Sequence, residues 1–203
     1  MNMCARYFKD EDYFDELSRI TGREMEDSDR KDQGRVDVHP SEEGIILEKD
    51  NRDEAEGGIL CRTVKWGFPC YDKKGLIINA RAENIEERRS FAKGIINNRC
   101  IIPASGFYEW DDSREKVTFS LREKPLILFG GIYDSFQGED RFVIITCDAN
   151  ASMAAVHDRM PLIVPEDRID TWFSPDFREL LKADMPELKA DRKYHQMSLF
   201  DMQ

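Results

Sequence analysis

The sequence predicts an α+β protein that is built on a curled, mainly antiparallel β-sheet or open β-barrel, with helices at its periphery. From Ile59 onward the chain consists of short runs of β-branched and aromatic residues, separated by Gly, Pro and charged residues. This pattern is typical of strands joined by tight turns. Stretches with helical spacing of apolar residues are fewer. The 203 residues, 40% of them hydrophobic, can form one well-buried core but are marginal for two.

Each expected strand is a short apolar run. The strands are Cys61–Phe68, Leu76–Ala80, Cys100–Ile102, Phe107–Trp110, Val117–Leu121, Leu126–Tyr133, Phe142–Cys147 and Pro161–Val164, with a further short strand at Gly44–Leu47. Helices are expected where apolar residues recur every three or four positions. They are Tyr7–Ile20, Ile85–Ile96, Pro165–Trp172 and Pro175–Leu181.

The negative charge of the chain is concentrated in one segment. The net charge is −11, but Lys9–Glu56 holds 18 acidic and 8 basic residues, so the rest of the chain sums to −1. The part from Arg23 to Glu56 is poor in aromatic residues and broken by Gly and Pro. We interpret it as an acidic surface excursion of a single domain covering residues 1–185. A basic face elsewhere is compatible with this distribution, so a phosphate-bearing partner is not excluded.

The composition argues against a membrane protein and against a secreted one. No run approaches the ~18 apolar residues of a membrane span, and the N-terminus lacks a secretory signal. The five cysteines are an odd set without a CxxC pair, which predicts neither disulfides nor a zinc site. We expect a cytoplasmic monomer that needs no metal and no cofactor.

One stretch sets a carboxylate among aromatic residues. Arg99–Trp110 begins as an apolar run, breaks at Pro103 and Gly106, and places Glu109 between two of its three aromatic residues. Apolar neighbours desolvate a carboxylate and raise its pKa, which suits a residue that transfers protons. The alternative is a strand-end carboxylate that faces water.

Two other stretches carry polar groups in an apolar frame. Asn79 and Arg81 stand two apart at the end of an apolar run, so on a strand they face the same side and can hold a phosphate or carbonyl oxygen. His157 follows a loop of small residues, Asp148–Ala155, and histidine exchanges protons near neutral pH. The alternatives are an exposed polar rim for the first pair and a satisfied core histidine for His157.

Trp66 and Cys4 complete the set of candidates. Trp66 stands between Lys65 and Gly67; core packing is the usual role of Trp, and stacking on nucleic-acid bases is the alternative. Cys4 gains a special chemistry if the residues before it are removed, because a terminal cysteine holds an amine and a thiol on adjacent carbons. Such a 1,2-aminothiol condenses with an aldehyde to an imine, and the thiolate then closes a stable thiazolidine ring.

In their order and spacing these motifs resemble the SOS-response-associated peptidase (SRAP) family. The resemblance runs from Cys4 to about Trp172. It is carried by Cys4–Arg6, Val64–Gly67, Ile78–Glu83, Arg99–Trp110 and His157–Pro161. It implies an SRAP-like fold and a sensor of abasic sites in single-stranded DNA, which crosslinks to the ring-opened sugar aldehyde through its N-terminal Cys. A cytoplasmic protein with this partner would be associated with the nucleoid.

The resemblance also implies catalytic roles for four matching residues. Cys4 would supply the thiolate and the α-amine. Glu109 would manage protons on that amine and during self-processing. His157 would act as acid and base on the sugar and favour its open aldehyde form. Asn79 would orient both the terminal Cys and the sugar.

Four further residues would bind DNA according to the same resemblance. Arg6, Arg81 and Arg159 would neutralise phosphates that flank the lesion. Trp66 would support the bent strand by stacking.

The N-terminus departs from the family pattern in two ways. The family begins Met-Cys-Gly, whereas Met1-Asn2 precede Met3-Cys4 here, and Ala5 replaces the glycine. A chain that starts at Met1 is expected to keep that residue, because Asn2 is bulky for methionine removal. Initiation at Met3 would restore the Met-Cys start. Ala5 is tolerable unless its position needs a positive φ.

Three hypotheses about function follow. The first is covalent capture of abasic sites after removal of the preceding residues, with a self-processing peptidase activity. The second is a peptidase that acts on other proteins. The third is a non-covalent module for single-stranded or damaged DNA, which applies if residues 1–3 are never removed.

The last residues, 186–203, are expected to form a charged tail that carries a short motif. Gln196-Met197-Ser198-Leu199-Phe200 resembles the pentapeptide by which bacterial repair proteins bind the DNA sliding clamp. Leu199 and Phe200 would fill an apolar pocket, and Gln196 would hydrogen-bond at its rim. The alternative is a terminal anchor that packs on its own domain. Clamp binding by a peptide spanning 194–203 tests this prediction.

Overall fold

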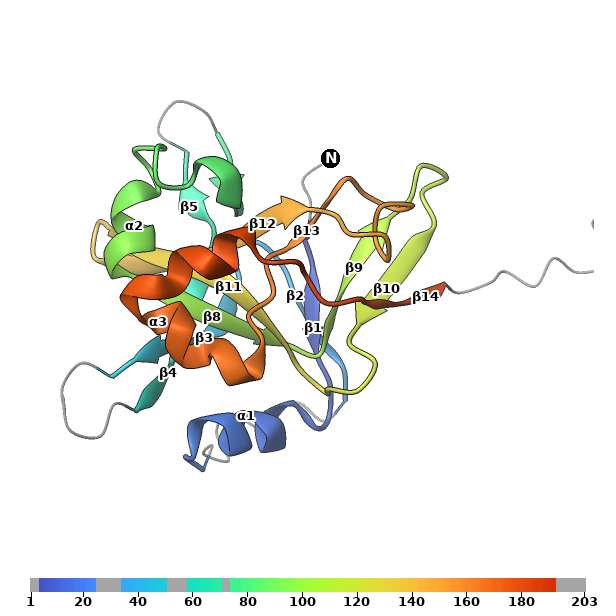
Figure 1. Ribbon diagram of the computed structural model, residues 1–203, viewed down its shortest axis with the longest axis horizontal. Coiled ribbons are helices and arrows are strands. Elements are labelled where there is room, and N and C mark those ends of the chain that lie inside the picture. The colour runs from blue at the N-terminus through green and yellow to red at the C-terminus, as the bar shows by residue number, and fades with distance from the viewer. Residues whose placement is uncertain (1–3, 25–33, 51–57, 71–73, 193–203) are drawn as a thin grey trace, which may run out of the picture.

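Two β-sheets form the framework of the protein (Figure 1). The computed structural model describes residues 4–24, 34–50, 58–70 and 74–192. The five-stranded sheet has the order β14-β10-β9-β1-β2 and is antiparallel throughout. Its strands are β1 (Tyr7–Lys9), β2 (Val36–Val38), β9 (Gly106–Trp110), β10 (Lys116–Ser120) and β14 (Lys189–Arg192).

The seven-stranded sheet contains a closed ring. Its strands are β3 (Glu43–Lys49), β4 (Ile59–Trp66), β7 (Asn79–Arg81), β8 (Arg99–Ala104), β11 (Ile127–Phe136), β12 (Glu139–Asp148) and β13 (Arg159–Pro161). The order β11-β8-β3-β4-β12 is closed by the pairing of β11 with β12, and β7 and β13 also pair with β12. A ring with an odd number of strands cannot alternate direction throughout, and the parallel pair β4–β12 satisfies this constraint.

The predicted fold class is therefore confirmed: the sheets are curled and mainly antiparallel, and the helices are peripheral. The strand ring is closed, whereas an open barrel or a curled sheet was expected. Two short strands, β5 (Phe68–Pro69) and β6 (Leu76–Ile77), form a separate two-stranded sheet between β4 and β7 in the chain.

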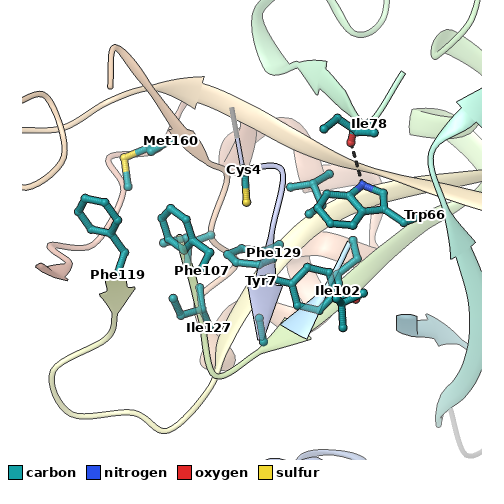
Figure 2. Close-up of a cluster of buried hydrophobic side chains, with 14 of the residues drawn as sticks. Cys4, Tyr7, Trp66, Ile78, Ile102, Phe107, Phe119, Ile127, Phe129 and Met160 are labelled. Carbon is teal, nitrogen blue, oxygen red and sulfur yellow. Dashed lines mark hydrogen bonds between the residues drawn. The ribbon is translucent and has the colours of Figure 1, made fainter. Parts of the chain in front are cut away.

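Side chains that alternate along the strands of the ring fill two cores. Ile102 and Ile144 belong to the core that also contains Phe107 of the five-stranded sheet, whereas their neighbours Ile101 and Val143 belong to the core under the helices. Figure 2 shows the first core, in which Cys4 and Trp66 lie among aromatic and aliphatic side chains. The start of the chain is thus part of the buried interior between the two sheets.

Short helices cover the outer face of the ring (Figure 1). They are the α-helices α1 (Tyr13–Thr21), α2 (Ala92–Asn97) and α3 (Ile169–Phe173), and the 3-10 helices η1 (Ala82–Asn84), η2 (Glu166–Arg168) and η3 (Pro175–Lys182). Leu17, Ile95, Trp172 and Leu180 anchor them in the second core. In the described part of the chain, no helix is both long and apolar enough to cross a membrane.

Two of the predicted helices begin later than expected. The helix expected over Tyr7–Ile20 starts at Tyr13, because Tyr7–Lys9 pair with β2 and β9 as strand β1. The helix expected over Ile85–Ile96 starts at Ala92 and follows a series of turns. In β1, pairing with strands from distant parts of the chain overrides the local helical spacing.

The acidic segment is not a surface excursion over residues 34–50, and this expectation was wrong. β2 pairs with β1 in the five-stranded sheet, and β3 lies between β4 and β8 in the ring. Ile46 and Leu47 are fully buried. The strand predicted at Gly44–Leu47 is present as β3, whereas the charged residues of the segment concealed β2.

The domain also extends beyond the predicted boundary at residue 185. Leu188 is buried, and β14 pairs with β10 from Lys189 to Arg192. The exposed, charged side chains of β14 explain why the sequence suggested a tail at this point. The pentapeptide with Gln196, Leu199 and Phe200 lies outside the described residues, so clamp binding stays a prediction.

Gly106 permits the crossover from one sheet to the other. β8 of the ring ends at Ala104, and β9 of the five-stranded sheet begins at Gly106. A Cβ atom on Gly106 would lie 2.5 Å from the carbonyl oxygen of Phe119 and 2.5 Å from Cζ of Phe8. Only glycine fits this close approach. The crossover places Glu109 on the strand that pairs with the start of the chain.

Candidate functional site

The central contact of the site joins the start of the chain to Glu109. Tyr7 of β1 pairs with Phe107 of β9, and the N–H of Tyr108 donates to the carbonyl oxygen of Arg6. This register brings Cys4 beside Glu109, and the backbone N–H of Cys4 donates to Oε1 of that carboxylate. Cys4 is 0% exposed and Glu109 is 2% exposed. Two of the predicted catalytic residues, distant in sequence, thus form one buried pair.

Glu109 has the electrostatics of a residue that transfers protons near neutral pH. Burial raises its pKa from 4.5 to about 7, although hydrogen bonds from the backbone N–H groups of Cys4 and Trp110 act in the opposite direction. The carboxyl group is therefore close to half protonated at neutral pH. It can accept a proton or donate one without a large energetic cost.

Cys4 is held in an unusual backbone conformation with a protonated thiol. Its φ is +49°, in the left-handed region that non-glycine residues rarely occupy. Burial, together with the negative charge of Glu109, raises the pKa of the thiol well above its ordinary value. Strain of this kind is retained where the surrounding structure fixes a residue, and such residues are concentrated at functional sites.

His157 approaches the same core from the loop between β12 and β13. Val156 and Met160, on either side of it in the chain, pack in the core that contains Cys4. Its Nδ1 accepts a hydrogen bond of 3.0 Å from the backbone N–H of Arg159, and Oδ1 of Asp158 lies 2.9 Å from the same nitrogen. A neutral ring with Nδ1 as acceptor carries its proton on Nε2, and a protonated ring would pair with Asp158. In both states Nε2 carries a proton that it can donate.

Asn79 and Arg81 lie on β7, beside the strand that leads to the His157 loop. β7 pairs in parallel with β12, and Asn79 lies opposite Ile144 while Arg81 lies opposite Thr146. Asn79 follows Ile78, which packs in the core with Cys4. Arg81 is exposed. The two residues therefore lie on one short strand next to the core that holds Cys4, and their roles at the site stay predictions.

Arg6 and Trp110 border the Cys4–Glu109 pair. The guanidinium of Arg6 lies 5.4 Å from the ring centroid of Trp110, and its Nη1 lies 3.6 Å from Oδ2 of Asp37. Trp110 received no role from the sequence, although it directly follows Glu109. It also lines a cavity of about 460 Å³ between the β9–β10 hairpin and residues 154–158, which include His157. This cavity is large enough for a sugar or a base.

Arg159 has its charge paired with two carboxylates in this structure, and its contact with a phosphate stays a prediction. Both terminal nitrogens donate to the carboxylate of Glu83, at 2.6 and 2.9 Å, and Nη1 also donates to Asp148. Nη2 donates to the carbonyl oxygen of Thr146 at 2.8 Å. Arg159 is 9% exposed. Its charge is compensated, and it fixes η1 against the end of β12 beside His157. No role was predicted from the sequence for Glu83, the partner of this arginine.

Trp66 is buried in the core, so its ring has no face open to a nucleic-acid base. It is 0% exposed, and its Nε1–H donates to the carbonyl oxygen of Ile78 at 3.1 Å (Figure 2). Its ring packs between Phe142, at a centroid distance of 6.0 Å, and Tyr7, at 5.3 Å. The usual role of Trp in a core applies here, and the bond to Ile78 supports the strand end that carries Asn79.

All five cysteines are free thiols. Within the residues that the structure describes, no three His, Cys, Asp or Glu side chains are grouped so that they could hold a metal ion.

The raised pKa of Glu109 predicts a specific pH dependence of stability. The folded protein binds the Glu109 proton more tightly than the unfolded chain does, so this contribution is complete below about pH 4.5 and is lost as the pH rises to about 7. Glu109→Gln keeps an acceptor for the Cys4 N–H and removes the titration. The free energy of unfolding of this variant, relative to wild type, should rise by about 2–3 kcal/mol between pH 5 and pH 8.

Urea unfolding at several pH values measures this difference. Glu115→Gln is the matched control, because Glu115 is exposed on the adjacent hairpin. The control should track wild type across the pH range. A Glu109→Gln curve that stays parallel to wild type would show that Glu109 is already ionised at pH 5.

The sequence matches a family model and is similar to known proteins. The family model of the SOS response associated peptidase (SRAP) matches residues 3–200. The abasic site processing protein YoaM of Bacillus subtilis (strain 168) is 32% identical over 179 residues, which cover 78% of this chain and 77% of YoaM. The abasic site processing protein YedK of Escherichia coli (strain K12) is 27% identical over 181 residues, covering 84% of this chain and 79% of YedK.

The fold is similar to that of solved structures as well. A crystal structure of a protein from Bordetella bronchiseptica superposes with a TM-score of 0.75 at 19% identity, covering 94% of this chain and 100% of its own. This likeness concerns the fold alone. The extent of the family match and the identity to YoaM decide the assignment: the chain belongs to the SOS response associated peptidase family.

Proposed function

We propose that this protein captures abasic sites in single-stranded DNA covalently, through the amine and thiol of an N-terminal Cys4. The observation that carries the proposal is the buried pair in which the Cys4 N–H donates a hydrogen bond to Glu109, whose carboxyl group has a pKa of about 7. The Cys4 nitrogen, which must gain and lose protons in this reaction, is therefore in hydrogen-bond contact with a carboxyl group that exchanges protons at neutral pH. The names of the relatives as abasic site processing proteins support the choice of substrate.

Cys4 must first become the N-terminal residue. In the full chain its nitrogen is an amide, which cannot form an imine with an aldehyde. Hydrolysis of the Met3–Cys4 peptide bond consumes one water, releases residues 1–3 and leaves a free amine. Glu109 lies at the leaving nitrogen and, in its protonated form, can supply the proton that this nitrogen needs. We propose this self-cleavage as the peptidase activity of the chain.

Capture then proceeds in steps that conserve atoms. The closed sugar opens as its C1 hydroxyl loses a proton, the ring C–O bond breaks and the ring oxygen gains a proton. The Cys4 amine adds to the aldehyde carbon, and loss of one water gives the imine. The Cys4 sulfur adds to the same carbon, the thiol proton leaves, and the nitrogen becomes a secondary amine in a thiazolidine ring.

Glu109 and His157 would divide the proton transfers between them. Glu109 contacts the Cys4 nitrogen, so it would take a proton from the ammonium and protonate the departing hydroxyl. His157 can donate from Nε2 while Nδ1 is held by Arg159 N–H or Asp158, which suits acid catalysis on the sugar. Asn79, at the edge of the core that holds Cys4, would orient the sugar. Burial keeps the Cys4 thiol protonated until the imine forms.

Two arginines at the site, the exposed Arg81 and the half-buried Arg6, support a DNA strand as the carrier of the aldehyde. Arg81 is exposed, and Arg6 lies between Asp37 and Trp110 at the border of the Cys4–Glu109 pair. Each phosphate contact by such a residue adds affinity that falls with salt. The overall charge of −11 does not oppose this role, because the acidity is concentrated in residues 9–56.

Two other functions would use the same surface. A non-covalent module for damaged single-stranded DNA needs the phosphate contacts but not Cys4. A peptidase for other proteins needs an open groove at Glu109, whereas Glu109 is buried against the chain's own nitrogen. The geometry favours chemistry at the chain's own terminus over both alternatives.

Cys4→Ala should form no heat-stable adduct with a single-stranded oligonucleotide that carries one abasic site. Cys4→Ser should also fail, because an oxygen closes a far less stable ring. Both variants should fold, and they should bind the oligonucleotide non-covalently as wild type does. Denaturing gels after incubation measure the adduct, and Cys147→Ala is a control for a thiol away from the terminus. An undiminished adduct with Cys4→Ala would refute the mechanism.

His157→Ala should slow crosslinking by on the order of 10²–10⁴, the contribution typical of an acid–base residue. The loss should be largest on an abasic sugar that equilibrates with its closed form. It should be much smaller on an oligonucleotide that carries a permanently open aldehyde, because that substrate needs no ring opening. Single-turnover time courses with both substrates measure the two rates. Equal losses on both would place His157 outside the ring-opening step.

A further inference from the structure

Arg159 joins three segments around the loop that carries His157. Its guanidinium donates to both oxygens of Glu83 on η1, at 2.6 and 2.9 Å, and to the carbonyl oxygen of Thr146 in β12, at 2.8 Å. Nη1 also pairs with Asp148, the last residue of β12. Because Arg159 is itself the first residue of β13, this one side chain ties both ends of the loop to η1.

Glu83 is the partner that fixes the plane of this guanidinium. A carboxylate that accepts from two nitrogens side by side sets the direction of an arginine side chain as well as its position. Asp148 has a side chain that is 87% exposed, so water weakens its pair with Arg159. Although burial alone would raise it, the hydrogen bonds from Arg159 lower the pKa of Glu83 below its ordinary value, so this carboxylate is charged at neutral pH.

The backbone of Arg159 in turn holds the ring of His157. Its N–H donates to Nδ1 of His157 at 3.0 Å, which leaves the proton of a neutral ring on Nε2. Oδ1 of Asp158 lies 2.9 Å from the same Nδ1 and favours the other tautomer, in which Nδ1 carries the proton and donates to Asp158. That tautomer has a bare Nε2 and cannot protonate a sugar oxygen. The position of the Arg159 backbone therefore decides whether a neutral His157 can act as an acid.

We infer that Glu83 is a positioning residue for proton transfer by His157. The inference rests on the proposed function, since it takes His157 to act on the sugar. Glu83 holds the Arg159 side chain, so the Arg159 N–H stays directed at Nδ1 and Nε2 keeps its proton. Without this carboxylate, the Arg159 side chain keeps its contacts with β12 but loses η1. The loop then gains freedom, and Asp158 can compete for Nδ1.

Crosslinking rates with two oligonucleotides test this role. Glu83→Ala should slow the capture of an abasic sugar that equilibrates with its closed form by about 10- to 100-fold, which is a part of what an acid–base residue contributes. With an oligonucleotide that carries a permanently open aldehyde, its rate should stay close to that of wild type. Glu83→Gln keeps an acceptor for the guanidinium and the shape of the side chain, so its loss should be smaller. Equal losses on both oligonucleotides would overturn the inference.

Glu86→Ala is the matched control, because Glu86 follows η1 closely in the chain and accepts from Arg178 at 2.6 and 2.9 Å. This variant removes an ion pair to η3 rather than to the His157 loop, so it should react with both oligonucleotides as wild type does. In Glu83→Ala the maximal rate at saturating abasic oligonucleotide should fall, whereas the half-saturating concentration should not change. A changed half-saturating concentration with an unchanged maximal rate would place Glu83 in DNA binding and contradict the inference.

The variant His157→Ala/Glu83→Ala separates positioning from an independent role. If Glu83 acts through His157, removing its carboxylate should add no further loss on the closed sugar once the imidazole is absent. Losses that multiply in the double variant would contradict the inference.

The nitrogen chemical shifts of the histidine rings give a readout that does not depend on crosslinking. The chain has three histidines, and the spectrum of His157→Ala assigns the signals of His157. At a pH where the ring is neutral, wild type should show the Nε2–H tautomer, and Glu83→Ala should show Nδ1–H in part of the population. Identical tautomers in the two proteins would refute the positioning role, whether or not adducts form. If wild type forms no adduct, covalent capture fails, and a tautomer that shifts in Glu83→Ala would still support the inference.

Discussion

The pairing of β1 with β9 is the constraint on which the rest of the site depends. It carries the start of the chain into the core between the two sheets and brings the Cys4 nitrogen to the Glu109 carboxylate. Burial then raises the pKa of both groups, so the thiol stays protonated and the carboxyl group titrates near pH 7. In the proposed reaction, the aminothiol of a terminal Cys4 is held in one geometry, with its proton donor already in place.

The family motifs predicted which chemical groups lie at the site, but they did not predict what each side chain contacts. The aromatic residues around Glu109 in the sequence correctly indicated that its carboxylate is desolvated. That Cys4 lies beside Glu109 could be expected only from the family resemblance. The contacts of Arg159 and Trp66 could not be predicted, because sequence spacing does not reveal what a side chain contacts. Arg159 is occupied by Glu83 and Asp148, and Trp66 packs between Tyr7 and Phe142.

The errors in the fold have one common cause, which is that pairing between distant strands overrides local pattern. β1 shows helical spacing, β2 lies in an acidic segment, and β14 is exposed along its length with mostly charged side chains. Each is a strand because a partner elsewhere satisfies its backbone. By contrast, the strands between Ile59 and Val164 were predicted well, because a buried strand appears in the sequence as a short apolar run.

Intact-mass measurement of the natively expressed protein, before and after incubation with an abasic oligonucleotide, tests the central claim most directly. The account predicts a protein whose mass begins at Cys4. It also predicts an adduct whose mass equals the sum of protein and oligonucleotide minus one water, as thiazolidine formation requires. A protein that retains the residues before Cys4 and forms no adduct would contradict covalent capture and leave non-covalent binding as the function of the site.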